Sequence, residues 1–333
     1  MTYKLSDFDY HLPEELIAQE PARPRDHARL LVYNRQTGAV SDDYFYNLNL
    51  YLPDSATLVA NNSKVEKCRL LFDNGSKEIF ILNRLNDKVA EALVRPGRKF
   101  RKGRVVTLAE GLEAKVMSIS EDGIRTLSLN RTLDDPVYDP YRATPFPPYI
   151  RPDEALSGEY QTVFAREPGS KAAPTAGLHF TERLIAGLKE KGYGWEEITL
   201  HVGLGTFAPV KEEDISNHIL HSERYSIDSR TAAALDRSVH KTAVGTTSVR
   251  VLESAVRRNG TIESGSGETD IFIKPGYSFK AVDSLVTNFH LPKSTLLMLV
   301  ASFAGFEEMH HLYRHAIEKK YRFYSFGDGM LIL

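Results

Sequence analysis

Hydrophobic and polar residues follow two different patterns along the chain, and the pattern changes near residue 130. Between residues 64 and 130, short β-like segments are separated by Gly, Asp and Asn, and no convincing helix lies among them. These segments are residues 77–85, 88–94, 104–110, 114–120 and 124–130. Closely spaced strands of this kind predict a small antiparallel β-barrel or sandwich.

After residue 150 the pattern alternates between helix and strand. A helix is predicted from a cap at Thr181 to a stop at Gly192, with apolar side chains on one face. A strand is predicted at 195–202. A second strand, at 241–244, is followed by a glycine turn and a helix that ends at Asn259 and Gly260. A third strand, at 284–287, precedes a buried helix capped by Ser294. This alternation indicates an α/β layer with a parallel or mixed sheet.

The order of these patterns predicts two domains. The first 63 residues have too little pattern to fold alone, so we expect them to pack with the C-terminal part. The predicted fold class is therefore a mixed α/β domain, residues 1–63 and 131–333, interrupted by an inserted antiparallel β-barrel, residues 64–130. The Pro-rich residues 134–152 are predicted to be an extended linker.

Composition narrows the class of protein. With 333 residues, 42% hydrophobic and 26% charged, the chain is typical of a folded protein. Acidic residues interrupt the N-terminus where a signal peptide needs an apolar run, and the apolar run at 295–306 is too short to cross a bilayer. We therefore expect a cytoplasmic protein without membrane contact. A single cysteine, Cys68, excludes an internal disulfide.

Two stretches are strongly basic, although the whole chain has a net charge of only −2. Each is either a solvated surface or a phosphate contact, and the sequence leaves both possibilities open. The first, residues 95–104, contains Arg95, Arg98, Lys99, Arg101, Lys102 and Arg104; the second, residues 314–322, contains Arg314, Lys319, Lys320 and Arg322.

Candidate chemistry concentrates where predicted strands end. Ligands of open α/β sheets lie beyond the carboxyl ends of strands, which here selects residues 201–207, 245–248 and 287–292. None is a standard nucleotide loop, because "GLGTF" lacks a third glycine and "GTTS" lacks the P-loop lysine. No zincin or serine-hydrolase motif is present either, so no metal is expected. Each histidine, taken alone, more often packs in a core than acts in catalysis.

Several of these segments carry a family resemblance. "YQTVFAREPGSKAAPTAGLHFT", "LHVGLGTFAPV", "VGTTSVRVLES" and "YRFYSFGDGMLI" resemble, in order, blocks of the S-adenosylmethionine:tRNA ribosyltransferase-isomerase family of queuosine biosynthesis. The resemblance implies a tRNA-modifying enzyme that transfers the ribosyl group of S-adenosylmethionine to a 7-aminomethyl-7-deazaguanine at the wobble position, giving epoxyqueuosine and releasing adenine and methionine. It implies tRNA and S-adenosylmethionine as partners, no prosthetic group, and the α/β fold with an inserted barrel. We also expect a monomer.

The chain departs from the family pattern at three positions. Ser63 and Lys64 stand in "NNSKV" where "NNTRV" is expected, and Gly329 stands where alanine is more frequent. The alternatives that stay open are an inactive RNA-binding relative and an S-adenosylmethionine-dependent methyltransferase.

The chemistry of such a transfer requires a base for a C5′ proton and an acid for the departing adenine. The candidates are His179, His290, His201 and Glu223. Arg250 with Thr246 and Thr247 suits the carboxylate of the methionine part of the ligand, and Asp270 or Asp328 suits its ammonium group. Three aromatic residues either stack on a base or pack in the core: Phe180, Phe207 and Phe289. The remaining candidate binding residues are Thr175, Gly177, Gly203, Gly205, Thr206, Gly245, Asn288 and Lys293. The basic residues of 95–104 and 314–322 are the candidate tRNA contacts.

Overall fold

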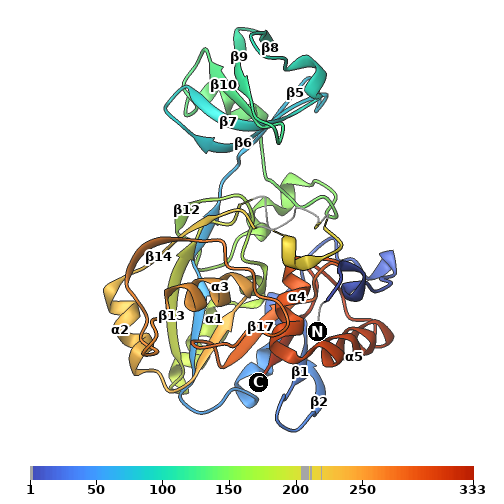
Figure 1. Cartoon of the computed structure of the whole chain (residues 1–333), viewed down its shortest axis with the longest axis vertical. Helices are drawn as coiled ribbons and strands as arrows, with labels where there is room; N and C mark the ends of the chain where they lie inside the picture. Colours follow the sequence, from blue (N-terminus) through green and yellow to red (C-terminus); the bar gives the residue numbers. More distant parts are fainter. Residues whose placement is uncertain (1–2, 204–209, 211, 219) are drawn as a thin grey trace. The chain divides into compact units, whose positions relative to one another are not determined.

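The computed structural model describes residues 3–203, 210, 212–218 and 220–333, and the chain divides into two compact units (Figure 1). Unit 1 comprises residues 1–64, 147–151 and 156–333, and unit 2 comprises residues 65–146 and 152–155. Each unit is described by itself.

Unit 2 is a seven-stranded antiparallel sheet that curls into a half-barrel. Its strand order is β11-β5-β6-β7-β10-β9-β8, and the five strands predicted from the sequence correspond to β6 to β10. The strands are β5 (Arg69–Phe72), β6 (Lys77–Arg84), β7 (Val89–Arg95), β8 (Val105–Ala109), β9 (Leu112–Ile119), β10 (Arg125–Leu129) and β11 (Arg142–Ala143). The curl brings β6 towards β8, since Lys77 Nζ donates to the Thr107 carbonyl over 2.7 Å.

The linker predicted over the Pro-rich stretch is wrong for its first half. Asp135 caps the 3₁₀ helix η6 (Pro136–Tyr141) by accepting from Val137 N, and proline at the first helical position sets the backbone angle that this turn needs. The Tyr138 side chain is fully buried, and the two residues that follow η6 form β11 against β5. Local capping and burial therefore order a segment whose composition alone indicates an extended chain.

Unit 1 is built on a nine-stranded mixed sheet of order β16-β14-β13-β3-β15-β17-β18-β1-β2. Its strands are β1 (Arg29–Tyr33), β2 (Val40–Tyr44), β3 (Thr57–Asn61), β13 (Gly194–Leu200), β14 (Glu223–Ile227), β15 (Lys241–Val244), β16 (Gly265–Thr269), β17 (Ser284–Asn288) and β18 (Gly329–Ile332). The neighbours β13, β3, β15 and β17 are parallel, so their carboxyl ends meet at one edge. A separate two-stranded sheet pairs β4 (Ser63–Val65) with β12 (Glu167–Ser170).

Alternate residues of the central strands face two different cores. Val59, Ala243 and Leu285 belong to a cluster with residues of the helices within 229–318, α2 (Ser229–Arg237), α3 (Thr246–Ala255), α4 (Thr295–Ala304) and α5 (Phe306–Glu318). Their neighbours Ala60 and Val244 belong to a second cluster with residues of α1 (Glu182–Glu190) and the 3₁₀ helix η4 (Phe45–Leu50). Because side chains of a strand alternate between faces, the sheet is covered by helices on both sides.

The three helices predicted from the sequence correspond to α1, α3 and α4. The predicted caps are confirmed, since Thr181 accepts from Leu184 N and Ser294 from Leu297 N. The end predicted for α3 is wrong by four residues, because Val256 turns to extended backbone and bridges Ile262.

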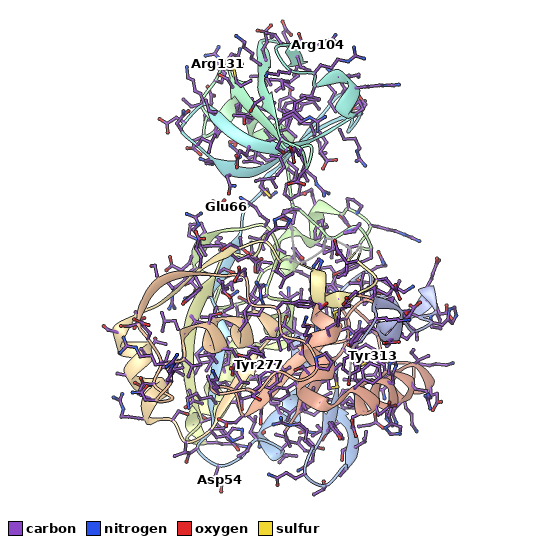
Figure 2. The ribbon with its side chains drawn as sticks, in the orientation of Figure 1. Asp54, Glu66, Arg104, Arg131, Tyr277 and Tyr313 are labelled. Atoms are coloured by element: carbon purple, nitrogen blue, oxygen red, sulfur yellow. The ribbon has the colours of Figure 1, made fainter. Side chains whose placement is uncertain are left out.

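Short 3₁₀ helices connect these elements. In unit 1 they are η1 (Leu5–Phe8), η2 (Glu14–Leu16), η3 (Arg25–His27), η4 (Phe45–Leu50), η8 (Thr175–His179) and η10 (Ile215–Asn217); η5 (Gly97–Lys99) belongs to unit 2, and η7 (Glu154–Tyr160) begins in unit 2 and continues in unit 1. Tyr313 of α5 is buried in the interior of unit 1 (Figure 2). Within the described ranges, every helix is too short or too polar to traverse a lipid bilayer.

Candidate active site

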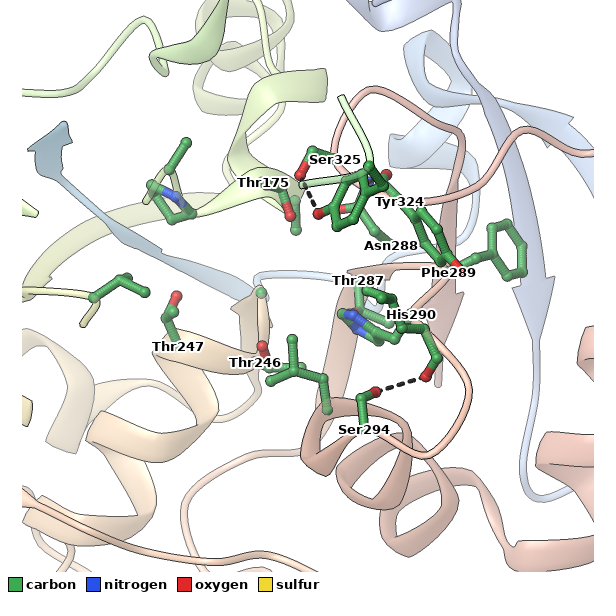
Figure 3. Close-up of a pocket in the computed structure, with 18 residues that line it drawn as sticks. Thr175, Thr246, Thr247, Thr287, Asn288, Phe289, His290, Ser294, Tyr324 and Ser325 are labelled. Carbon is green, nitrogen blue, oxygen red and sulfur yellow. Dashed lines mark hydrogen bonds between the residues drawn. The ribbon is translucent and has the colours of Figure 1, made fainter. Parts of the chain in front are cut away.

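A cavity in unit 1 opens at the carboxyl ends of β15 and β17 (Figure 3). The start of α3 forms one side, with Thr246 and Thr247, and the segment after β17 forms the other. The lining residues are Tyr149, Ala173, Pro174, Thr175, Ala176, Val202, Gly245, Thr246, Thr247, Thr287, Asn288, Phe289, His290, Leu291, Ser294, Leu296, Tyr324 and Ser325. Segments far apart in sequence therefore converge where the parallel-sheet rule places a ligand.

The start of α3 is suited to a negatively charged group. Gly245 precedes the helix at φ +90°, a backbone conformation that favours glycine, and has no side chain with which to cap the first amides. The Thr247 hydroxyl is buried and has no hydrogen-bond partner among the residues that the structure describes. Because helix N-termini carry partial positive charge, a carboxylate would gain both the amides and this hydroxyl.

Asn288 ends β17 on the opposite side of the cavity. Its amide nitrogen lies 3.1 Å from His179 Nε2 and 3.1 Å from the Tyr324 carbonyl oxygen. Its Oδ1 is buried and has no partner within the described part of the chain. His179 is itself buried and stacks on Phe45 with ring centroids 4.3 Å apart. Burial, with the positive charges of Arg322 and Arg25, lowers the pKa of His179 to about 3.

His290 is the one of the four acid–base candidates that lines this cavity. Its Nε2 lies 2.7 Å from Thr287 Oγ1, its backbone N–H donates to the Tyr313 hydroxyl over 2.9 Å, and its carbonyl accepts from the Tyr10 hydroxyl. Burial lowers the pKa of His290 to about 3, so its imidazole is neutral at pH 7.

Two tyrosines give the cavity an aromatic wall. The rings of Tyr149 and Tyr324 lie 4.6 Å apart, and the Tyr149 hydroxyl is 2.8 Å from the Ser325 hydroxyl. Burial raises the pKa of Tyr324 to about 12, so its hydroxyl stays protonated. Tyr324 has φ +71°, a conformation that non-glycine residues seldom adopt. A flat base would find stacking partners here.

A second, smaller cavity shares Leu296 with the first and contains the Glu223–Arg250 ion pair. Arg250 Nη1 donates to Glu223 Oε2, Glu223 Oε1 accepts from Gly203 N over 2.7 Å, and both charged side chains are at most 8% exposed. Arg250 Nε has no partner. Arg250 therefore already balances one buried carboxylate, and a second would have to share it.

The predicted charged binding residues Asp328, Asp270 and Lys293 lie outside the lining of the cavity. Asp328 accepts from Arg29 N, Arg322 N and the Arg322 guanidinium, so its oxygens already hold a loop together. Asp270 is exposed after β16, and Lys293 pairs with Asp9 on the surface. Neither lines the cavity that holds Asn288.

The aromatic and glycine candidates mostly serve packing. Phe180 and Phe289 are fully buried among other rings, although Phe289 also borders the cavity. A Cβ at Gly177 would meet Phe164 at 2.7 Å, and half-buried His201 packs against Gly169. Gly205, Thr206 and Phe207 lie outside the described residues.

The candidate tRNA contacts differ in exposure. In unit 2, Arg98, Arg101, Lys102 and Arg104 are exposed, Lys99 is half-buried, and Arg95 pairs with Glu78 over 2.9 Å; Arg104 lies on the outer surface (Figure 2). In unit 1, Arg314, Lys319 and Lys320 are exposed. Arg322 is different, because it holds Asp328 and the Glu20 carbonyl.

Steric contacts explain one of the departures from the family pattern. A Cβ at Gly329 would lie 2.9 Å from Phe45 Cζ and 3.3 Å from His179 Nε2, so the stacked pair fills the space that alanine would need. Ser63 is fully buried next to Asn61, and Lys64 is exposed. Nothing in the structure explains these two changes.

Sequence reasoning missed five hydroxyl-bearing residues that line the cavity: Tyr149, Thr287, Ser294, Tyr324 and Ser325. Thr287 and Ser294 stood inside predicted segments and only their side-chain direction was unknown. Tyr149 lay in the predicted linker, and Tyr324 and Ser325 precede a strand that inserts into the middle of the sheet. Among the described residues, no three His, Cys, Asp or Glu side chains gather as metal ligands.

Comparison with known proteins adds the family. The model of the "Queuosine biosynthesis protein" family matches residues 5–332. Proteins named S-adenosylmethionine:tRNA ribosyltransferase-isomerase from Carboxydothermus hydrogenoformans and Thermotoga maritima are 47% and 48% identical, each covering 99% of this chain and aligned over all of its own length. The crystal structure of a Thermotoga maritima S-adenosylmethionine tRNA ribosyltransferase aligns with a TM-score of 0.57 and 40% identity over 98% of this chain and 100% of its own. This chain belongs to the queuosine biosynthesis protein family.

Proposed function

We propose that the protein is an S-adenosylmethionine:tRNA ribosyltransferase-isomerase. It transfers and isomerises the ribosyl group of S-adenosylmethionine onto the 7-aminomethyl-7-deazaguanine at the tRNA wobble position. The products are epoxyqueuosine-tRNA, adenine and methionine. Full-length similarity to proteins of that name supports the activity, and the cavity at the ends of β15 and β17 supports its location in unit 1.

The observation that carries the location is a pair of unpartnered polar atoms in one cavity. Thr247 Oγ1 lies at the open start of α3, and Asn288 Oδ1 lies across from it beside the tyrosine wall. Buried polar atoms without partners cost about 1–3 kcal/mol each, a cost that a bound ligand relieves. The start of α3 suits the methionine carboxylate, and the rings of Tyr149 and Tyr324 suit a base.

His290 is the proposed acid–base residue of this cavity. The sulfonium of S-adenosylmethionine acidifies the C5′ protons, so a base positioned nearby can begin the reaction. With its pKa lowered to about 3 by burial, His290 is neutral at pH 7 and can accept a proton, although it is a weak base. Glu223, one cavity away and paired with Arg250, is the second candidate.

The tRNA is proposed to contact both units. We infer that the two units correspond to the domains predicted from the sequence, with the inserted domain extending to residue 146. The exposed basic residues of 95–104 in unit 2 and of 314–320 in unit 1 are the proposed phosphate contacts. The closed barrel, the monomeric state and the cytoplasmic location stay predictions.

The test is direct product analysis. Purified protein is incubated with S-adenosylmethionine and tRNA that carries the aminomethyl-deazaguanine, and mass spectrometry follows free adenine and the modified nucleoside. Both products together are expected. S-adenosylhomocysteine without adenine would indicate a methyltransferase, and tRNA binding without either product would indicate an inactive relative.

A further inference from the structure

The Asn288 amide is held in one orientation by three acceptors. Its Nδ2 lies 3.1 Å from His179 Nε2, 3.1 Å from the Tyr324 carbonyl and 3.5 Å from the Asp328 carbonyl. An amide nitrogen can donate towards these atoms, whereas an amide oxygen in the same place would face only acceptors. The oxygen must therefore take the other side, where it is buried and unpaired in a residue that lines the cavity.

His179 contacts Asn288 but does not border the cavity. It is 3% exposed, with one ring face against Phe45 and with Gly329 beside Nε2. Its pKa of about 3, set first by burial, keeps the imidazole neutral at pH 7. Since Nε2 accepts from Asn288, the ring proton is assigned to Nδ1.

The groups behind Asn288 are rigid. Asp328 is fixed by the backbone amides of Arg29 and Arg322 at 3.0 and 2.8 Å, and Tyr324 N–H donates to the Phe289 carbonyl over 3.1 Å. The carbonyls that Asn288 meets are therefore anchored at both ends of the 324–328 turn. Such a supporting shell is what a binding group needs in order to present one atom in one direction.

We propose that Asn288 Oδ1 accepts a hydrogen bond from the exocyclic amino group of a purine-type base, and that His179 is a positioning residue that orients Asn288. This inference rests on the proposed function and deepens its site. The base is assigned because the tyrosine pair of Tyr149 and Tyr324 stands next to Asn288 and offers ring faces. Adenine of S-adenosylmethionine and the deazaguanine of tRNA each carry an exocyclic amino group, and the experiment distinguishes the two bases.

The first experiment compares two variants of one residue. His179→Phe keeps the stack on Phe45 and removes the acceptor, whereas His179→Gln keeps an acceptor near Nε2 and cannot transfer protons. We expect His179→Phe to lower kcat/KM at least tenfold and His179→Gln to recover most of that loss, with the pH–rate profile of the wild type. If both variants lose kcat equally and His179→Gln loses one limb of the profile, His179 transfers a proton and the proposal is wrong.

A double-mutant cycle tests whether His179 acts through Asn288. Asn288→Ala removes the acceptor of the substrate amine, so adding His179→Phe to it should cause no further loss. Additive losses would overturn the proposal. The cycle is measured as two equilibrium affinities, that for S-adenosylmethionine by calorimetry and that for tRNA by a binding titration. Asn288→Ala should change the affinity for S-adenosylmethionine if the bound base is adenine, and the affinity for tRNA if it is deazaguanine. If neither affinity changes, the proposal is contradicted.

The two proposals fail in different ways. Absence of adenine release by the wild type would contradict the proposed function, while the binding cycle can still be completed without turnover. Thermal unfolding of each variant controls for loss of fold. If His179→Phe does not fold, Asn288→Ala and His179→Gln still decide the result.

Discussion

In the two cavities of unit 1 the polar groups are mostly buried, whereas in the 95–104 stretch of unit 2 the charged groups are mostly exposed. Arg250 and Glu223 are at most 8% exposed and have each other as partners. Arg95 is 75% exposed, and its partner Glu78 also binds Arg69. The same kinds of side chain therefore serve different physical tasks, since desolvated groups give specificity and solvated cations give long-range attraction that salt screens.

The largest difference in the free energy of unfolding should appear when one ion pair is broken in each region. Glu223→Ala leaves the Arg250 charge buried without its partner, which should lower the free energy of unfolding by about 3–5 kcal/mol. Arg95→Ala breaks an exposed pair and should cost less than about 1 kcal/mol. Urea titration of both variants checks this. Equal losses would mean that the two environments are not as different as their exposure indicates.

Charge reversal in the 95–104 stretch should affect tRNA alone. Changing Arg98, Arg101, Lys102 and Arg104 together to Glu should weaken tRNA binding about 100-fold at low salt. The slope of log K against log salt should fall by about 0.7–0.9 for each phosphate that the protein no longer neutralises. Calorimetry with S-adenosylmethionine should give an unchanged affinity, because the cavity lies in unit 1. Weaker tRNA binding that does not depend on salt would contradict an electrostatic role.

As the pH falls, protonation of buried histidines should lower the stability of unit 1 but not that of unit 2. His179 and His290 have pKa values of about 3 in the folded protein and 6.5 when unperturbed. Between these values the unfolded chain binds protons that the folded chain does not, so stability is present above pH 6.5 and is lost as pH falls towards 3. Each histidine should contribute a loss of about 1.4 kcal/mol per pH unit in that window.

Hydrogen exchange measured separately for the two units checks this pH dependence. Unit 2 contains no histidine, so it is the internal control. His179→Gln should remove the contribution of His179 to the pH dependence of unit 1. An unchanged pH dependence in that variant would mean that His179 is not buried as a neutral group in solution.

The smallest effect concerns one hydroxyl at the start of α3. Thr247→Val should leave stability nearly unchanged, because the hydroxyl has no partner, and should weaken S-adenosylmethionine binding about fivefold. Thr242→Val is the matched control, since that hydroxyl is also buried and unpaired but lies in β15 away from the cavity. Calorimetry that gave both variants the same affinity loss would remove Thr247 from the site.

How far the sequence predicts this molecule depends on the range of the interactions. Local signals succeeded, because the caps at Thr181 and Ser294 and the strand alternation of unit 2 are set by near neighbours. The end of α3 was missed because Val256 pairs with Ile262 outside the helix. The ends of strands located the cavity region, but they did not separate Asn288, which borders the cavity, from His179 behind it. Side-chain direction at that depth is set by residues that are distant in sequence, such as Tyr324 behind Asn288 and Phe45 against His179.

The insertion of β18 between β17 and β1 has a consequence for synthesis. Residues 329–332 pair with Thr287 and Asn288 on one side and with Leu30 on the other, so they join the β1–β2 hairpin to the rest of the sheet. Because β1 is made before β18, a nascent chain cannot close the sheet until β18 has been made. Contacts of such long sequence separation are slow to form. The turn behind Asn288 is completed in the same step, so the proposed site is also assembled late in synthesis.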